Sequence, residues 1–168
     1  MRLAFFLAVV LNLASAPTSA CAAPDEAQAF EAHRQSAVQG DAQGQTQLGL
    51  MYLNGQGVEE DAVEAVWWFR KSAEQGHADA QIHLGLLLQE GHGVRQDDAE
   101  AFLWLRQSAE QGNAVGQYYL GVSLAEGRGV MQDLDGALDW LTRAARQELA
   151  AARDYLWANG NISIDSGH

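Results

Sequence analysis

The stretch Leu48-Gly49-Leu50-Met51-Tyr52-Leu53-Asn54-Gly55-Gln56-Gly57-Val58 decides the fold, because the chain carries it three times. Its Leu-Gly pair and its closing Gly-x-Gly-Val return at 84–94 and again at 120–130. A second pattern of Asp, Ala, Trp and Ala follows each copy at fixed offsets, first as Asp61, Ala65, Trp68 and Ala73. Successive copies are 36 residues apart without an insertion. A fixed period of this length is the signature of a stacked repeat array.

Each unit predicts two antiparallel helices, the first over 42–54, 78–90 and 114–126. In the first copy, apolar and small residues recur at helical spacing: Ala42, Gln45, Leu48, Gly49 and Tyr52. The glycine inside each first helix costs about 1 kcal/mol relative to alanine. We therefore expect another helix to approach closely at this position. We assign that neighbour to the second helix of the same unit, with its Trp packed alongside.

The Gly-x-Gly element ends the first helix of each unit, because its first glycine can take the left-handed conformation after a helix. It follows a helix and lacks the third glycine and the lysine of a phosphate-binding loop. Asp61 and Glu64 then predict a capping box at the start of the second helix, which stops at Gly76. Asp97 and Glu100 repeat the box, whereas the third copy keeps Asp133 but has Gly136 in place of the Glu.

The ends of the array are predicted to be half-repeats. A lone second helix over 25–39 forms the N-terminal cap, followed by full repeats at about 41–76, 77–112 and 113–148, with Glu148 where a glycine is expected. A lone first helix over 149–158 forms the C-terminal cap, with Trp157 at the place of the internal glycine. We expect residues 159–168 to be disordered. The fold class is therefore all-α, a right-handed α-solenoid with three full repeats and half-repeat caps.

The N-terminus has the pattern of a secretory signal peptide over residues 1–22. Met1-Arg2 precedes an apolar run over 3–13, which is too short to span a bilayer, and Ala20-Cys21-Ala22 offers an Ala-x-Ala cleavage site. The sequence thus predicts an exported, periplasmic protein without a transmembrane segment. As a minority alternative, Ser19-Ala20-Cys21 resembles part of a bacterial lipoprotein signal, which would place a lipid anchor on Cys21.

The charge and the cysteine count limit the class of partner. The formal net charge is −12, and Cys21 is the single cysteine. Nucleic acid and anionic membrane both require a basic face, so neither is expected as a partner. No disulfide can form within the chain, and its stability must come from the helical core.

These recurring residues resemble the Sel-1-like repeat family, a relative of the tetratricopeptide repeats. The family's unit combines the Leu-Gly pair, Gly-x-Gly-Val and the Asp, Ala, Trp and Ala positions, and the match covers nearly all of the chain after residue 22. Leu88 and Leu124 replace the tyrosine kept at Tyr52, and Ser72 and Ser108 replace an alanine. The resemblance implies a scaffold that binds other proteins. Some cysteine-rich exported members are linked to β-lactams, but their paired cysteines are lacking here.

We expect a partner to bind on the concave face, which the first helices line in such arrays. Removing the packing positions leaves an apolar stripe with an acidic rim, suited to an amphipathic helix or an extended peptide with basic flanks. The candidate binding residues are Thr46, Leu50, Leu53, Asp79, Ile82, Leu86, Gln89, Glu90, Tyr118, Val122 and Glu126. The alternative is a tight superhelix in which these residues only pack between neighbouring first helices.

No catalytic, metal or cofactor site is predicted. His33, His77, His83, His92 and His168 form no His-x-x-x-His pair, and the acidic clusters fall at helix starts, where they favour the helix dipole. The favoured function is a non-catalytic adaptor or scaffold of the bacterial periplasm or envelope. Two alternatives remain: an inhibitor or immunity protein for a secreted toxic enzyme, and a hydrolase of β-lactams or cell-wall fragments. The sequence leaves the oligomeric state open.

Overall fold

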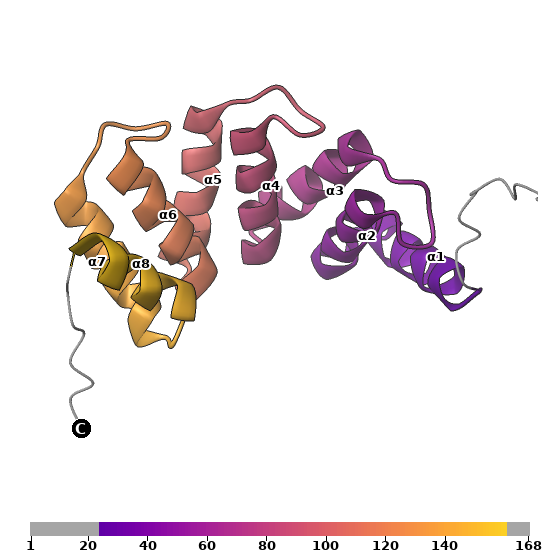
Figure 1. Cartoon of the computed structure of the whole chain (residues 1–168). Coiled ribbons are helices and arrows are strands. Elements are labelled where there is room, and N and C mark those ends of the chain that lie inside the picture. Colours follow the sequence, from indigo (N-terminus) through magenta and orange to yellow (C-terminus); the bar gives the residue numbers. More distant parts are fainter. Residues whose placement is uncertain (1–23, 161–168) are drawn as a thin grey trace, which may run out of the picture.

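A computed structural model describes residues 24–160, which form eight α-helices and no strand. The helices are α1 (Pro24–Val38), α2 (Ala42–Asn54), α3 (Ala62–Glu74), α4 (Ala78–Glu90), α5 (Asp98–Glu110), α6 (Ala114–Glu126), α7 (Leu134–Arg146) and α8 (Ala150–Gly160). They stack in chain order into an arch, with α1 at one end and α8 at the other (Figure 1). The prediction of an all-α solenoid is confirmed.

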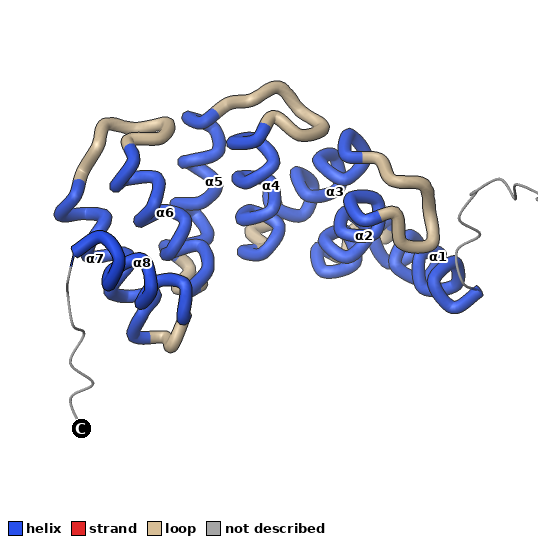
Figure 2. The backbone as a smooth tube through the Cα atoms, viewed as in Figure 1, coloured by secondary structure: helices blue, strands red, loops and turns tan. Residues whose placement is uncertain are grey.

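The first helices α2, α4 and α6 have the predicted bounds. The loops over 55–61, 91–97 and 127–133 connect them to the second helices α3, α5 and α7, and they are longer than the turns between units (Figure 2). We expected the last helix to end at residue 158, whereas α8 also includes Asn159 and Gly160. The predicted signal peptide, Cys21 and residues 161–168 lie outside the described residues.

The glycine inside each first helix does face the second helix of its own unit. A Cβ at Gly49 would lie 2.9 Å from the ring of Phe69, and one at Gly85 would lie 2.9 Å from Leu105. The third unit repeats this contact between Gly121 and Leu141. The neighbouring side chain is thus the residue directly after each Trp, not the Trp that we expected. Trp68 itself packs in a cluster with residues of α1 and α2.

The second helices begin with the predicted aspartate caps, but the reciprocal half of the capping box is absent from the hydrogen bonds of residues 24–160. The Asp61 side chain accepts from the backbone N–H groups of Val63 and Glu64. The N–H of Asp61 instead donates to the carbonyl of Tyr52 at 2.9 Å, at the end of α2. In the next unit, Glu100 pairs with Arg70 and accepts from the Trp104 indole N–H at 3.1 Å. Glu64 and Glu100 therefore do not accept the hydrogen bond that the capping box predicts.

The Gly-x-Gly loops hold each unit against the one before it. Gly55 has φ 66°, the left-handed conformation that the sequence predicted. The second glycine of each loop is also left-handed, and a Cβ at Gly93 or Gly129 would collide with the backbone at the start of the preceding second helix. Only glycine permits this approach, so the loop is a contact between repeats as well as a turn.

A buried glutamine on each first helix ties three consecutive helices together. Gln45, Gln81 and Gln117 are at most 5% exposed. Each Nε2 donates to a carbonyl on the preceding second helix, at 3.1, 3.2 and 3.4 Å respectively. Each Oε1 accepts from a glutamine at the end of the following second helix, at 2.7, 2.7 and 2.9 Å; these partners are Gln75, Gln111 and Gln147. We call this set the glutamine clamp. Because buried polar groups need partners, the clamp favours one register of the stack.

Candidate interaction groove

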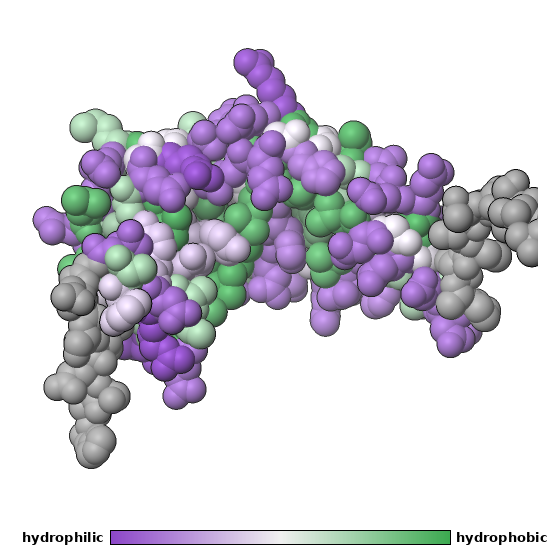
Figure 3. Space-filling view, in the orientation of Figure 1, coloured by the Kyte–Doolittle hydropathy of each residue, from purple (hydrophilic) through white to green (hydrophobic). Residues whose placement is uncertain are grey.

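The first helices line the hollowed face of the arch. Direct contacts across repeats join α4 and α6, and a cleft of about 360 Å³ extends over α2, α4 and α6. A second cleft of about 230 Å³ continues between α4 and α6, and Leu86 and Tyr119 line both. The two clefts therefore form one groove, which we call the first-helix groove. Figure 3 shows apolar and hydrophilic side chains interleaved across the molecule in this view.

Residues of α2, α4 and α6 line the larger cleft, together with His77 at the N-cap of α4. Its lining residues are Gln43, Thr46, Gln47, Leu50, His77, Asp79, Ile82, His83, Leu86, Val115 and Tyr119. The smaller cleft is lined by Leu86, Gln89, Glu90, Tyr119, Val122, Ser123, Glu126 and Arg128. Nine of the eleven predicted binding residues thus lie along the groove.

Two of those nine are buried in its floor, so the expectation that they are exposed was wrong. Thr46 is 2% exposed, and its hydroxyl lies 2.8 Å from that of Ser72 and 3.1 Å from Nδ1 of His77. Ile82 is 5% exposed. Thr46 therefore packs against the following second helix α3 and the start of α4, and it does not face an open groove.

The other two predicted residues do not line the groove. Leu53 packs against the core cluster around Phe69 and Leu84. Tyr118 turns towards the C-terminal end, where its ring centroid lies 6.2 Å from that of Tyr155 on α8. Burial raises the pKa of the Tyr118 hydroxyl, which agrees with this packed position. The apolar stripe is therefore narrower than predicted.

The sequence reasoning missed the position occupied by Gln47, His83 and Tyr119. These residues are 36 apart, and all three line the larger cleft. The position follows 43 by four residues and precedes 50 by three, so helical spacing already placed it on the predicted stripe. His83 stacks on the Phe69 ring at a centroid distance of 5.0 Å, and burial lowers its pKa, with Asp79 opposing the shift.

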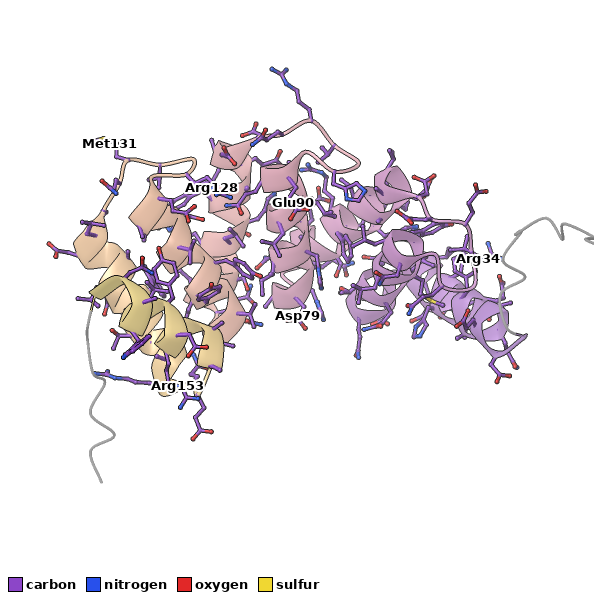
Figure 4. The ribbon with its side chains drawn as sticks, viewed as in Figure 1. Arg34, Asp79, Glu90, Arg128, Met131 and Arg153 are labelled. Carbon is purple, nitrogen blue, oxygen red and sulfur yellow. The ribbon has the colours of Figure 1, made fainter. Side chains whose placement is uncertain are left out.

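Carboxylates stand at both ends of the groove. Asp79 and Glu90 lie at opposite ends of α4 (Figure 4), and both are exposed. Asp79 accepts from the Asn113 amide at 3.0 Å, and Glu126 pairs with Arg128 at 2.8 Å. Neither Asp79 nor Glu90 has an ion pair among residues 24–160. Within this part of the chain, no basic side chain neutralises either carboxylate.

Across residues 24–160, no group of three or more His, Cys, Asp or Glu is placed to hold a metal ion. The same part of the chain has no helix long and apolar enough to cross a membrane. The arrangement offers apolar surface, hydrogen-bonding groups and negative charge to another molecule.

Stacked two-helix units with a groove along their first helices define a helical-repeat protein of the tetratricopeptide-like class. The chain belongs to the Sel1 repeat family, because the family's sequence model matches residues 42–77, 78–113 and 114–149. Proteins with Sel1 repeats are generally protein-interaction scaffolds and generally non-catalytic. None of the curated proteins matches the chain at a significant level.

The solved structures that are similar to this chain include the following three. A protective antigen of uropathogenic Escherichia coli, c5321, has 39% identity and a TM-score of 0.76, covering 81% of this chain and 30% of its own. A Sel1 repeat protein from Oxalobacter formigenes has 35% identity and a TM-score of 0.70, covering 78% and 98%. Cysteine-rich protein B of Helicobacter pylori has 17% identity and a TM-score of 0.62, covering 79% and 95%, and supports the fold alone. This chain thus spans less than a third of the E. coli antigen.

Proposed function

We propose that this Sel1-repeat protein is an adaptor that binds a short segment of a partner protein along the first-helix groove. The observation that carries the proposal is the continuity of the two clefts across α2, α4 and α6. A groove across three parallel helices suits an extended peptide or an amphipathic helix better than a compact small molecule.

The middle of the groove supplies the apolar contacts. Leu50, Leu86 and Val122 are half-buried at equivalent positions of the three repeats, and Tyr119 lies between the two clefts. A partner segment with two or three apolar side chains at matching intervals would cover them. Tyrosine and other large side chains at the centre of an interface commonly carry much of the binding energy.

The ends of the groove favour basic flanks on the bound segment. Asp79 and Glu90 carry negative charge at opposite ends of α4 without an ion pair in the described part of the chain. The net charge of −12 adds a field of the same sign, which speeds the approach of a basic segment. Lysine or arginine on either side of the apolar residues would pair with these carboxylates.

We place this adaptor in the periplasm or at the cell envelope of a bacterium. The proposal rests on the sequence of residues 1–22, which has the charged start, apolar run and small-residue cleavage site of an export signal. A processed N-terminus at Ala23, measured by intact mass after expression in a bacterium, would support export. An N-terminus retaining Met1 would contradict it, and a lipid mass on Cys21 would indicate anchoring.

A peptide-display selection against the protein tests the binding mode. We expect enriched peptides to combine spaced apolar residues with lysine or arginine, and to bind more weakly as salt rises. Leu86→Ala should reduce the affinity of a selected peptide by about 10-fold or more, as expected for a central apolar contact. Glu90→Lys should reduce it at low salt and much less at high salt.

Leu103→Ala provides a matched control, because Leu103 is 55% exposed on second helix α5, away from the residues that line the groove. It should leave peptide affinity unchanged. Enriched peptides whose affinity responds to Leu103→Ala but not to Leu86→Ala would move the site to the other face and overturn the proposal.

A further inference from the structure

We propose that the two ends of the array are complementary, and that copies of this chain associate head to tail by packing α1 of one copy against α8 of another. The contact would complete a two-helix repeat, with α8 as its first helix and α1 as its second. It uses surfaces apart from the first-helix groove and is independent of the proposed adaptor function.

The outer face of α1 has the residues of a repeat interface, but none of the other helices among residues 24–160 covers it. Ala65, Ala101 and Ala137 occupy one repeat position on the second helices, and all are at most 2% exposed, because each packs on the first helix of its unit. Ala29 holds the same position on α1 and is exposed. Within the described residues, α1 contacts α2 but no first helix of its own.

The outer face of α8 likewise has no second helix packed on it in the described part of the chain. Gly49, Gly85 and Gly121 are buried where the second helix of each unit packs. Trp157 holds this position on α8 and is 73% exposed, one of the largest apolar side chains that the described surface presents. An end that only protects the array from solvent would carry a polar residue here.

The side chains at the two ends differ in size from those at the same positions within a repeat. The second helices carry Trp68, Trp104 and Trp140 at a position that is Ala32 on α1, where the side chain is small and exposed. The first helices carry glycine at the position of Trp157. By the repeat register, Trp157 would lie over Ala29 and His33, because Gly85 lies against the carbonyl of Ala101 and the side chain of Leu105. The joined pair is therefore wider at this point than a repeat, and the small side chain of Ala32 next to His33 leaves room for the indole ring.

Each end of the array also carries one of the two side chains that would form a contact of the glutamine clamp. Gln39 holds the position of Gln75, Gln111 and Gln147, which donate to a glutamine on the first helix of their own unit. On α8 that glutamine position is Arg153, which is exposed. The guanidinium of Arg153 can donate to the side-chain carbonyl of Gln39 from another copy. The register of the repeats therefore aligns both the apolar and the polar contacts.

The association must join different molecules. Arg34 on α1 and Arg153 on α8 lie at opposite ends of the arch (Figure 4), so the two faces cannot meet within one chain. Because the faces differ, the contact is heterologous and leaves a free end on each copy, which allows further growth. One helix-to-helix contact is smaller than a standard interface of about 1,600 Å², so we expect weak association, with a Kd of about 10 μM to 1 mM.

Sedimentation velocity of the purified protein, from about 1 μM to about 1 mM, tests the proposal over this range of Kd. The mean mass should rise with concentration beyond a dimer. Trp157→Glu and Ala29→Glu should each abolish this rise, since both side chains are exposed and the substitutions leave the fold intact. Ala27→Glu and Ala151→Glu, at other exposed positions of α1 and α8, should leave it unchanged.

A mixture of the two disruptive variants separates this arrangement from others. Trp157→Glu retains an intact α1 face and Ala29→Glu an intact α8 face, so the mixture should form a dimer and nothing larger. A monomer at every concentration would overturn the proposal. Loss of association with Trp157→Glu alone, with Ala29→Glu unaffected, would indicate a symmetric contact through α8 and would also overturn it.

Discussion

Replacing Gln81 with leucine removes the central part of the glutamine clamp and nearly keeps the size of the side chain. Gln81 is 1% exposed. Its Nε2 donates to the carbonyl of Ala73 at 3.2 Å and to Oε1 of Gln107 at 3.3 Å. Its Oε1 accepts from Nε2 of Gln111 at 2.7 Å. The substitution therefore disconnects α4 from polar groups on both α3 and α5.

The expected loss of stability is about 3 kcal/mol, taking each of the three hydrogen bonds at a net value of about 1 kcal/mol. A larger penalty is avoided for two reasons. The carbonyl of Ala73 keeps its bond from the Gly76 N–H at 2.9 Å, and the exposed amide of Gln111 can turn to water. Gln111→Ala should cost less, about 1 kcal/mol, because that side chain lies at the surface.

Urea unfolding followed by far-UV circular dichroism measures the free energy of unfolding of both variants, which is obtained from the midpoint and the slope of each curve. We expect Gln81→Leu to lower the midpoint more than Gln111→Ala. If Gln81→Leu unfolded at the same urea concentration as the wild type or a higher one, apolar burial would outweigh the polar link. The view that the clamp stabilises this register would then be refuted.

Three further predictions concern single positions. Glu148 has φ 63°, so Glu148→Gly should stabilise the protein by about 1 kcal/mol, whereas Glu148→Ala should not, as thermal unfolding would show. Gly129→Ala should cost about 2–4 kcal/mol, because its Cβ would collide with the carbonyl of Asp98, and Gly127→Ala should cost less since only its conformation is strained; urea midpoints compare them. Burial holds the pKa of His83 below its ordinary value, so the unfolded chain binds the proton more readily. Stability should therefore fall as the pH drops below about 6.5 and level off below the folded-state pKa, and His83→Gln should flatten that part of the profile.

Much of the fold could be predicted from the sequence because its determinants are local or periodic. The 36-residue period defines the units, and the aspartate caps and Gly-x-Gly loops mark where helices begin and end. The close approach at Gly49, Gly85 and Gly121 was also predictable, since an internal glycine recurring at one helical position indicates a packed neighbour.

The candidate groove was predictable only in part. Helical spacing identifies a face, and nine of the eleven proposed residues lie along it. It cannot say which positions of that face the neighbouring helices cover. In the structure Thr46 and Ile82 are buried, and Tyr118 turns towards α8. The position of Tyr119 was within reach, because it has the same spacing as the rest of the stripe.

The sequence by itself determined the number of helices, their order and their pairing, because these depend on patterns within one repeat. Only the tertiary structure decided which side chains remain exposed on the groove, which residue fills the space above each helical glycine, and how Gln81 joins three helices. These features depend on the angle and distance between repeats. That geometry follows from the packing of all the contacts together and has no signature within a single unit.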